Sequence, residues 1–202
     1  MAHIQKTLKY AKWLAIYNWS SSTMSVISTT SMLNIISKPE SNSLLSINYI
    51  GKDVIGQLAS MFYLWKNSKK VDKQNPLKYI TYGCIFQQVG FVIEYSSIFA
   101  NTDKYYILPL LGFCNVLKNI SFTVIGAINA KNMRNISPNN IGEIYMKITT
   151  ANTLASTFGL ISGITIINFM PHKYISTLIV PSLSFLSIYT LRKATKVASE
   201  PL

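Results

Sequence analysis

Three charged side chains lie inside stretches apolar enough to cross a bilayer, and they are the chain's best candidates for chemistry. Asp53 and Glu94 are two of only seven acidic residues, and Lys118 lies in the apolar stretch after Glu94. A charge at membrane depth is costly unless it is paired or hydrated, so such residues usually mark a partner, a pathway or a relay. We expect Lys118 to lie among the two carboxylates and to neutralise part of their charge.

Polar residues share helix faces with these charges. Asn115 precedes Lys118 by three residues and Gln87 precedes Glu94 by seven, so each pair lies on one side of a helix. Two interpretations of the resulting polar cluster remain open. One is a site near the bilayer midplane for an anion, a zwitterion or protons, and the other is a structural set of ion pairs that holds the helices together.

The stretch around Asp53 also has two interpretations. If it is one helix, Asp53, Gly56 and Ser60 share a face on which small residues let a neighbouring helix approach closely. The run 51–56 could instead be a break whose exposed backbone lines a cavity, as in transporters with discontinuous helices. Lys52 lies too near the middle of the stretch to reach the membrane interface, so it joins the predicted cluster.

A second polar group precedes the fifth apolar stretch. Asn139 and Asn140 lie in a polar loop, and Glu143 and Lys147 follow with the favourable acid-before-base spacing of four residues. Glu143 also suits the positive end of a helix. We expect these four residues to form a gate or a contact at the loop. The alternative is that Glu143 and Lys147 form only a helix-terminal ion pair at the membrane surface.

The elements that must position these groups have the composition of a membrane protein. The chain of 202 residues is 49% hydrophobic and 13% charged, against about 25% charged in a typical soluble domain. Reading windows of about 20 residues predicts an all-α, polytopic helical membrane protein with about six spans. The predicted spans are Trp13–Ser37, Leu44–Trp65, Leu77–Phe99, Tyr105–Asn129, Ile144–Phe169 and Tyr174–Leu191.

Basic residues agree with six spans, because topology follows the Lys and Arg bias of short loops. The six spans predict that both termini lie on the positive side and that 1–202 is a single transmembrane domain. This domain has a basic flank at 1–12, polar loops at 66–76 and 130–143, and a basic tail at 192–202. The segment 1–12 lacks the features of a secretory signal. It is either the positively charged flank of the first span or a weak organellar targeting signal. Twelve residues fall on the positive side, Lys6, Lys9, Lys12, Lys66, Lys69, Lys70, Lys73, Lys131, Arg134, Arg192, Lys193 and Lys196, and only Lys38, Lys104 and Lys173 on the other.

Several classes of function are disfavoured. Cys84 and Cys114 have no companion at metal-ligand spacing, and no nucleophile with its base or phosphate-cradling glycine loop is present. We therefore expect no metal, no cofactor and no enzyme activity. The net charge of +12 fits topological bias and attraction to the lipid bilayer, because nucleic-acid binding would need basic residues gathered on a soluble face.

Short motifs occur in order from about Tyr17 to Leu191, with Trp19 near the beginning. They are Lys52-Asp53 followed by Gly56, Phe62-Tyr63-Leu64-Trp65, Glu94, Asn115-Val116-Leu117-Lys118, Gly126-Ala127 and Asn139-Asn140-Ile141-Gly142-Glu143-Ile144-Tyr145-Met146-Lys147. Their order resembles that of the root UVB sensitive family. The resemblance implies a multi-span organellar protein linked to plastids, light stress and vitamin B6 homeostasis, acting in complexes with homologous family members.

The chain departs from the family pattern at two inner positions. Ile128-Asn129 stands where relatives carry Thr-Arg, which removes a cation, and Ala151-Asn152 stands where they carry Gln-Glu. It also stops soon after the sixth span and resembles the membrane core of longer members. For a non-plant member we expect a mitochondrial membrane, with a plastid membrane as the alternative.

Two hypotheses of function follow. The first is a membrane protein that binds or transports a small polar solute through the cluster of Asp53, Glu94 and Lys118. The second is a non-catalytic structural or assembly subunit, whose charges pair with other membrane subunits. Convergence of the charges inside one chain favours the first hypothesis, and an outward-facing set favours the second.

Overall fold

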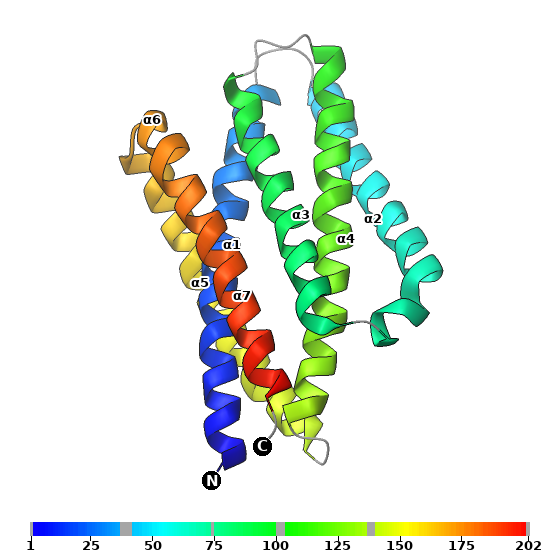
Figure 1. Cartoon of the computed structure of the whole chain (residues 1–202). Coiled ribbons are helices and arrows are strands. Elements are labelled where there is room, and N and C mark those ends of the chain that lie inside the picture. Colours follow the sequence, from blue (N-terminus) through cyan, green and yellow to red (C-terminus); the bar gives the residue numbers. More distant parts are fainter. Residues whose placement is uncertain (1, 37–41, 74, 100–103, 137–139, 201–202) are drawn as a thin grey trace.

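The computed structural model describes residues 2–36, 42–73, 75–99, 104–136 and 140–200. It is all-helical over those residues, with long helices that run up and down a bundle (Figure 1). A short 3-10 turn, η1 (Ser97–Phe99), follows α3. The last apolar stretch consists of α6 (His172–Tyr174), a π-helical segment η2 (Ile175–Ile179) and α7 (Val180–Ser199). The other helices are α1 (Ala2–Ile36), α2 (Asn42–Lys73), α3 (Pro76–Ser96), α4 (Lys104–Ile136) and α5 (Ile141–Phe169).

The sequence explains where α3 and the last apolar stretch begin. The side chain of Asn75 accepts a hydrogen bond from the Leu77 amide at 3.0 Å, and Pro76 occupies the first helical position, where its missing N–H costs nothing. Pro171 separates α5 from α6. Pro181 lies within the first two positions of α7, directly after the π-helical segment.

The helices form an inner group with one helix attached on each side. The helix α1 packs against α5 and α7, α3 packs against α4 and α7, and α2 packs mainly against α4. Contacts of α1 with α3, and of α4 with α7, complete the inner group of α1, α3, α4 and α7. The outer helices α2 and α5 lie at opposite edges of this group (Figure 1).

The apolar core has two parts, one toward each end of the bundle. One contains Tyr10, Ile128 and Leu191 near the two termini, and the other contains Met24 and Phe91 near the α3–α4 end. Between them the inner helices contribute the buried polar side chains of Ser20, Gln87 and Ser187, whereas Glu94 lies beyond Phe91, beside the second part of the core.

Within the described residues, three helical segments are long and apolar enough to cross a membrane by length and composition. They are Pro109–Ile136, Ile141–Phe169 and His172–Ser199. The expectation of six long helices is confirmed, and each predicted span coincides with one of them. That α1, α2 and α3 also cross a membrane stays a prediction, because hydroxyls, amides and charges dilute their apolar residues.

Both ends of the chain lie at the same end of the bundle (Figure 1). The Lys6 ammonium donates to the backbone oxygen of Glu200 at 2.5 Å, which ties the start of α1 to the end of α7. The C-terminal ends of α2 and α4 lie there too (Figure 1). The basic residues of those segments are therefore gathered at one end, while the membrane side they face stays a prediction.

The helices extend further than the predicted spans. The flank 1–12 is helical from Ala2, and most of the predicted loops 66–76 and 130–143 is also helix, because α2 continues to Lys73, α4 continues to Ile136 and α5 begins at Ile141. The tail beyond 192 is helical to Ser199. Lysine is a good helix former, so these helices continue past their apolar parts. The helix α2 has no break at 51–56, which corrects the alternative of a discontinuous second span.

Candidate functional site

Glu94, near the end of α3, is the centre of a buried polar cluster. Its side chain has no exposed surface. The oxygen Oε2 accepts hydrogen bonds from the Lys118 ammonium at 2.7 Å and from the Ser28 hydroxyl. The oxygen Oε1 lies 3.9 Å from the Lys52 ammonium and has no hydrogen-bond partner among the described residues. Four helices therefore meet at one carboxylate.

Asp53 connects this cluster to the surface of α2. The Asn115 amide donates to Asp53 Oδ1 at 3.0 Å and to the backbone oxygen of Lys52 at 2.8 Å. Lys52 lies 3.9 Å from the same Asp53 oxygen. The Asp53 side chain is 45% exposed, whereas that of Lys52 is 5% exposed. One carboxylate thus faces outward while the other is enclosed.

Glycines let the helices approach closely enough to build the cluster. A methyl group on Gly56 would lie 3.1 Å from the backbone oxygen of Asn115, and one on Gly90 would lie 3.0 Å from that of Cys114. A larger side chain at either position would push α2 or α3 away from α4. The shared face of Asp53 and Gly56 thus packs against α4, as the one-helix interpretation predicts.

The electrostatics of the cluster are balanced. Lys52 and Lys118 supply two positive charges, and Asp53 and Glu94 supply two negative ones, so formal charges cancel. Lys118 also lies 5.6 Å from the centre of the Phe91 ring, within range of a cation–π interaction. Each cation of the cluster has an anionic neighbour. A solute that carries both a positive and a negative charge could therefore break one ion pair within the cluster and form two ion pairs with the cluster's side chains.

Gln87 lies outside this group of contacts. Its Oε1 accepts a hydrogen bond from the Tyr17 hydroxyl at 2.8 Å, and its buried Nε2 has no partner among the described residues. The neighbouring Gln88 buries both amide atoms without partners in the same part of the chain. A shared helix face does not bring Gln87 to Glu94, because seven residues along α3 separate them by about 10 Å; Tyr17 of α1 bonds the Gln87 amide instead.

The residues of the predicted loop gate lie apart from the cluster. Glu143 and Lys147 form an exposed ion pair at 2.5 Å on the first turns of α5. Asn140 precedes α5 and makes no side-chain cap, and Asn139 lies outside the described residues. The geometry matches a surface pair at a helix start.

Replacing Glu143 with Gln is expected to leave the thermal unfolding temperature of the detergent-solubilised protein unchanged. Both partners are mostly exposed, and solvent screens such a pair. A melting curve beside the unmodified protein measures this. A clear drop in the melting temperature would show that the pair supports more than the surface of α5.

Ser28 was missed by the sequence analysis. It is fully buried on α1 and donates directly to Glu94. A serine carries no charge, so it does not stand out as a functional group in an apolar stretch. Its chemistry as a donor becomes visible once α1 is placed beside α3.

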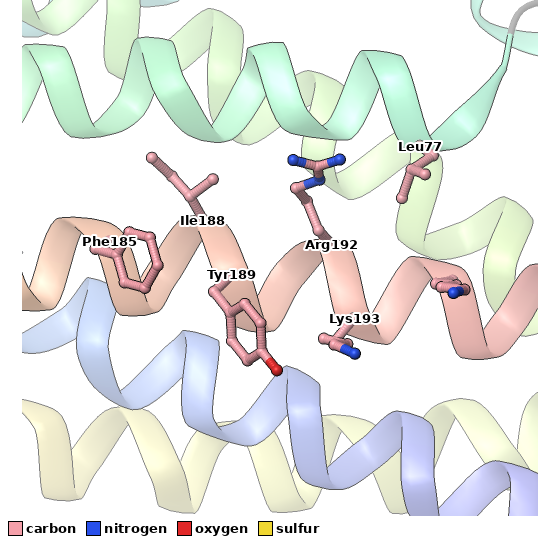
Figure 2. A pocket seen from close by; sticks show the side chains of 7 residues that line it. Leu77, Phe185, Ile188, Tyr189, Arg192 and Lys193 are labelled. Carbon is pink, nitrogen blue, oxygen red and sulfur yellow. The ribbon is translucent and has the colours of Figure 1, made fainter.

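A separate cavity of about 380 Å³ lies at the end of α7 near the termini. Figure 2 shows Phe185, Ile188, Tyr189, Arg192 and Lys193 projecting from α7 around it, with Leu77 of α3 opposite. The Lys193 ammonium lies 5.6 Å from the centre of the Tyr189 ring. Aromatic and basic side chains next to apolar ones are typical of a membrane interface, so this cavity is best explained as part of the surface toward lipid.

The described residues contain no group of three or more His, Cys, Asp or Glu side chains that could hold a metal ion. The two cysteines are free and buried. The site is therefore composed of ion pairs and hydrogen bonds.

Comparison with known proteins identifies one family. The model of the vitamin B6 photo-protection and homoeostasis domain matches residues 5–199, nearly the whole chain. No curated protein matches the chain, and no solved structure does.

Proposed function

Because the chain belongs to the vitamin B6 photo-protection and homoeostasis family, also called the root UVB sensitive family, we propose that it binds a small polar solute and moves it across a membrane. The observation that carries the proposal is the enclosed carboxylate of Glu94, contacted by α1, α2 and α4 and left with an oxygen that accepts no hydrogen bond. Enclosed ionisable groups in membrane helices usually belong to a pathway or a relay.

The geometry suggests how such a site works. Glu94 Oε1 is the acceptor for a solute N–H or O–H, since it lies 3.9 Å from Lys52 and accepts no hydrogen bond from the described residues. The partly exposed Asp53 offers a first contact at the surface of α2. Binding would then give Glu94 Oε1 the hydrogen bond that no described residue supplies.

The family description names vitamin B6, so its forms are the first solutes to test. The full chain is reconstituted into liposomes, and uptake of tritiated pyridoxine, pyridoxal and pyridoxal 5′-phosphate is compared with that of empty liposomes. Lack of uptake of any of them would count against transport of this vitamin.

Replacing Glu94 with Gln is expected to lower uptake at least tenfold when uptake is expressed per amount of folded protein in the liposomes, since the change also removes one partner of a buried ion pair. The amide keeps the shape of the side chain but removes the charge that Lys118 and Lys52 contact. Glu143→Gln is the matched control, because it makes the same change on the exposed start of α5. Equal uptake by both variants would show that Glu94 is not part of the pathway.

A subunit of a larger membrane complex is the second candidate. The helix α2 carries exposed large apolar residues such as Leu58, Met61 and Trp65, and the half-exposed Asp53 lies on the same helix. Affinity purification from detergent-solubilised native membranes tests this candidate through partners and assembly size. A large stoichiometric complex would favour a subunit, and recovery alone or as a small oligomer would favour transport. We propose an organellar membrane as the location, mitochondrial before plastid.

A further inference from the structure

The packing pattern of the six long helices is unchanged when the first three exchange places with the last three. Exchanging α1 with α4, α2 with α5 and α3 with α7 turns the α1–α5 contact into the α4–α2 contact, and the α1–α7 contact into the α4–α3 contact. The α1–α3 contact becomes the α4–α7 contact. Each exchanged helix runs in the opposite direction to its counterpart (Figure 1). This is the arrangement of two inverted halves.

Hydrogen bonds at the two outer helices correspond in the same way. The Asn115 side chain of α4 donates to the backbone oxygen of Lys52 in α2 at 2.8 Å. The Thr23 side chain of α1 donates to the backbone oxygen of Gly159 in α5 at 3.1 Å. Each outer helix is thus held to its inner helix by a side chain that donates to a main-chain oxygen.

A glycine follows each accepting residue by four positions. A methyl group on Gly56 would lie 3.1 Å from the Asn115 backbone oxygen, and one on Gly163 would lie 3.0 Å from the Thr23 backbone oxygen. Asn115 and Thr23 therefore each have two roles: the side chain donates the hydrogen bond to the outer helix, and the backbone oxygen lies close to that helix's glycine. The correspondence holds at the level of atoms as well as helices.

A cavity of about 330 Å³ lies where the two halves meet, between α1, α4 and α5. It is close to the middle of these helices, and α1 and α4 touch each other only sparingly. Its volume is within the range of about 300–1,000 Å³ usual for small-molecule sites. The lining residues are Tyr17, Asn18, Ser21, Ser22, Ser25, Phe122, Ile125, Gly126, Asn129, Ser156 and Leu160.

Hydroxyl groups in this cavity differ from those on the outer face of α5. Thr157 and Thr165 on that face donate to the backbone oxygen four residues earlier. The hydroxyls of Ser22, Ser25 and Ser156 make no hydrogen bond with any residue in the described ranges. All three side chains are partly exposed, so their hydroxyls are accessible to a molecule in the cavity.

The chemistry of the lining defines what would fit. Among the described residues no charged side chain lines the cavity, and two aromatic side chains, Tyr17 and Phe122, line it together with hydroxyls and amides. Tyr17 also joins the cavity to the buried Gln87 amide, whose nitrogen has no described partner. A fully charged solute would lose its hydration there without an ionic partner.

We propose that this cavity at the junction of two inverted halves is the chamber that holds the transported solute, and that it takes an uncharged, hydroxyl-bearing aromatic or heteroaromatic molecule. The inference rests on the proposed transport function. The charged cluster at Glu94 then lies on the route of the solute, while the cavity sets the choice of solute.

Labelling of a cysteine placed in the cavity tests this proposal on the full chain in liposomes. Ser25→Cys is treated with the uncharged thiol reagent N-ethylmaleimide in the presence and absence of pyridoxine or pyridoxal 5′-phosphate. The native Cys84 and Cys114 are fully buried, so background labelling should be low. We expect pyridoxine to slow labelling at least fivefold and the phosphorylated form to have no effect. Ser182→Cys, on the exposed side of α7, is the control and should label at one rate throughout.

Uptake measured on the same liposomes separates the two proposals. Pyridoxine uptake without protection of Ser25→Cys would contradict the proposal that the cavity holds the solute, but it would not contradict transport. Failure of Ser25→Cys to label, or equal protection by the phosphorylated form, would also overturn the cavity as a chamber for uncharged solutes. Absence of any uptake by the unmodified chain would overturn the proposed function, and the cavity proposal with it.

Discussion

Replacing Lys118 with Met is expected to destabilise the fold by about 3–5 kcal/mol, the usual cost of removing one partner from a buried ion pair. Glu94 would keep Lys52 at 3.9 Å, but it would lose its 2.7 Å partner inside a site with almost no exposed surface. Methionine fills a similar volume, so the effect reports mainly on charge. Denaturant unfolding in detergent, followed by circular dichroism, measures it.

The double variant Glu94→Gln with Lys118→Met provides the control. It removes both charges, so its stability should be closer to that of the unmodified chain than the stability of Lys118→Met alone. The difference between the single and double changes gives the coupling energy of the pair. If the two changes are simply additive, the ion pair contributes no coupling and the cluster's geometry needs another explanation.

Replacing Gly159 with Ala is expected to destabilise the α1–α5 contact by about 1–3 kcal/mol or more, the cost of overpacking a tight interface. The added methyl would meet the backbone oxygen of Trp19 and would lie 2.9 Å from the Ser22 Cβ. A backbone oxygen has no rotamer that could relieve the clash. The melting temperature of the purified protein measures the loss.

Gly51→Ala is the matched control, because nothing lies within 4 Å of the position that the methyl would occupy. Alanine favours helix over glycine by about 1 kcal/mol, so this variant should be neutral or slightly more stable. A loss of stability at Gly51 equal to that at Gly159 would show that the effect does not come from the tight α1–α5 contact.

Much of the fold could be predicted from the sequence, because apolar stretches and proline positions are local signals. Six long helices follow from them. Helix ends could not be placed the same way, since Lys69 and Arg134 continue a helix as well as apolar residues do. Whether α2 was broken at Gly51 depended on its packing against α4, which no local pattern records.

The site was predictable where a charge stood in an apolar stretch. Glu94 and Lys118 are such residues, and the structure brings them together. Ser28 and the serines of the cavity carried no charge, so their positions on α1 looked like dilution. Their spacing, with Ser21, Ser25 and Ser28 at intervals of three or four, was the signal that could have revealed one polar face.

The tight α1–α5 contact also determines how the protein adapts to bilayer thickness. The 29 residues of α5 rise about 43 Å, which exceeds the hydrocarbon depth of about 30 Å. A helix of that length fits by tilting or by locally thickening the bilayer. Because Gly159 and Gly163 hold α5 against α1, its tilt cannot change alone. A thinner bilayer would therefore tilt α1 together with α5, so the pair that joins the two halves would respond to the membrane as one unit.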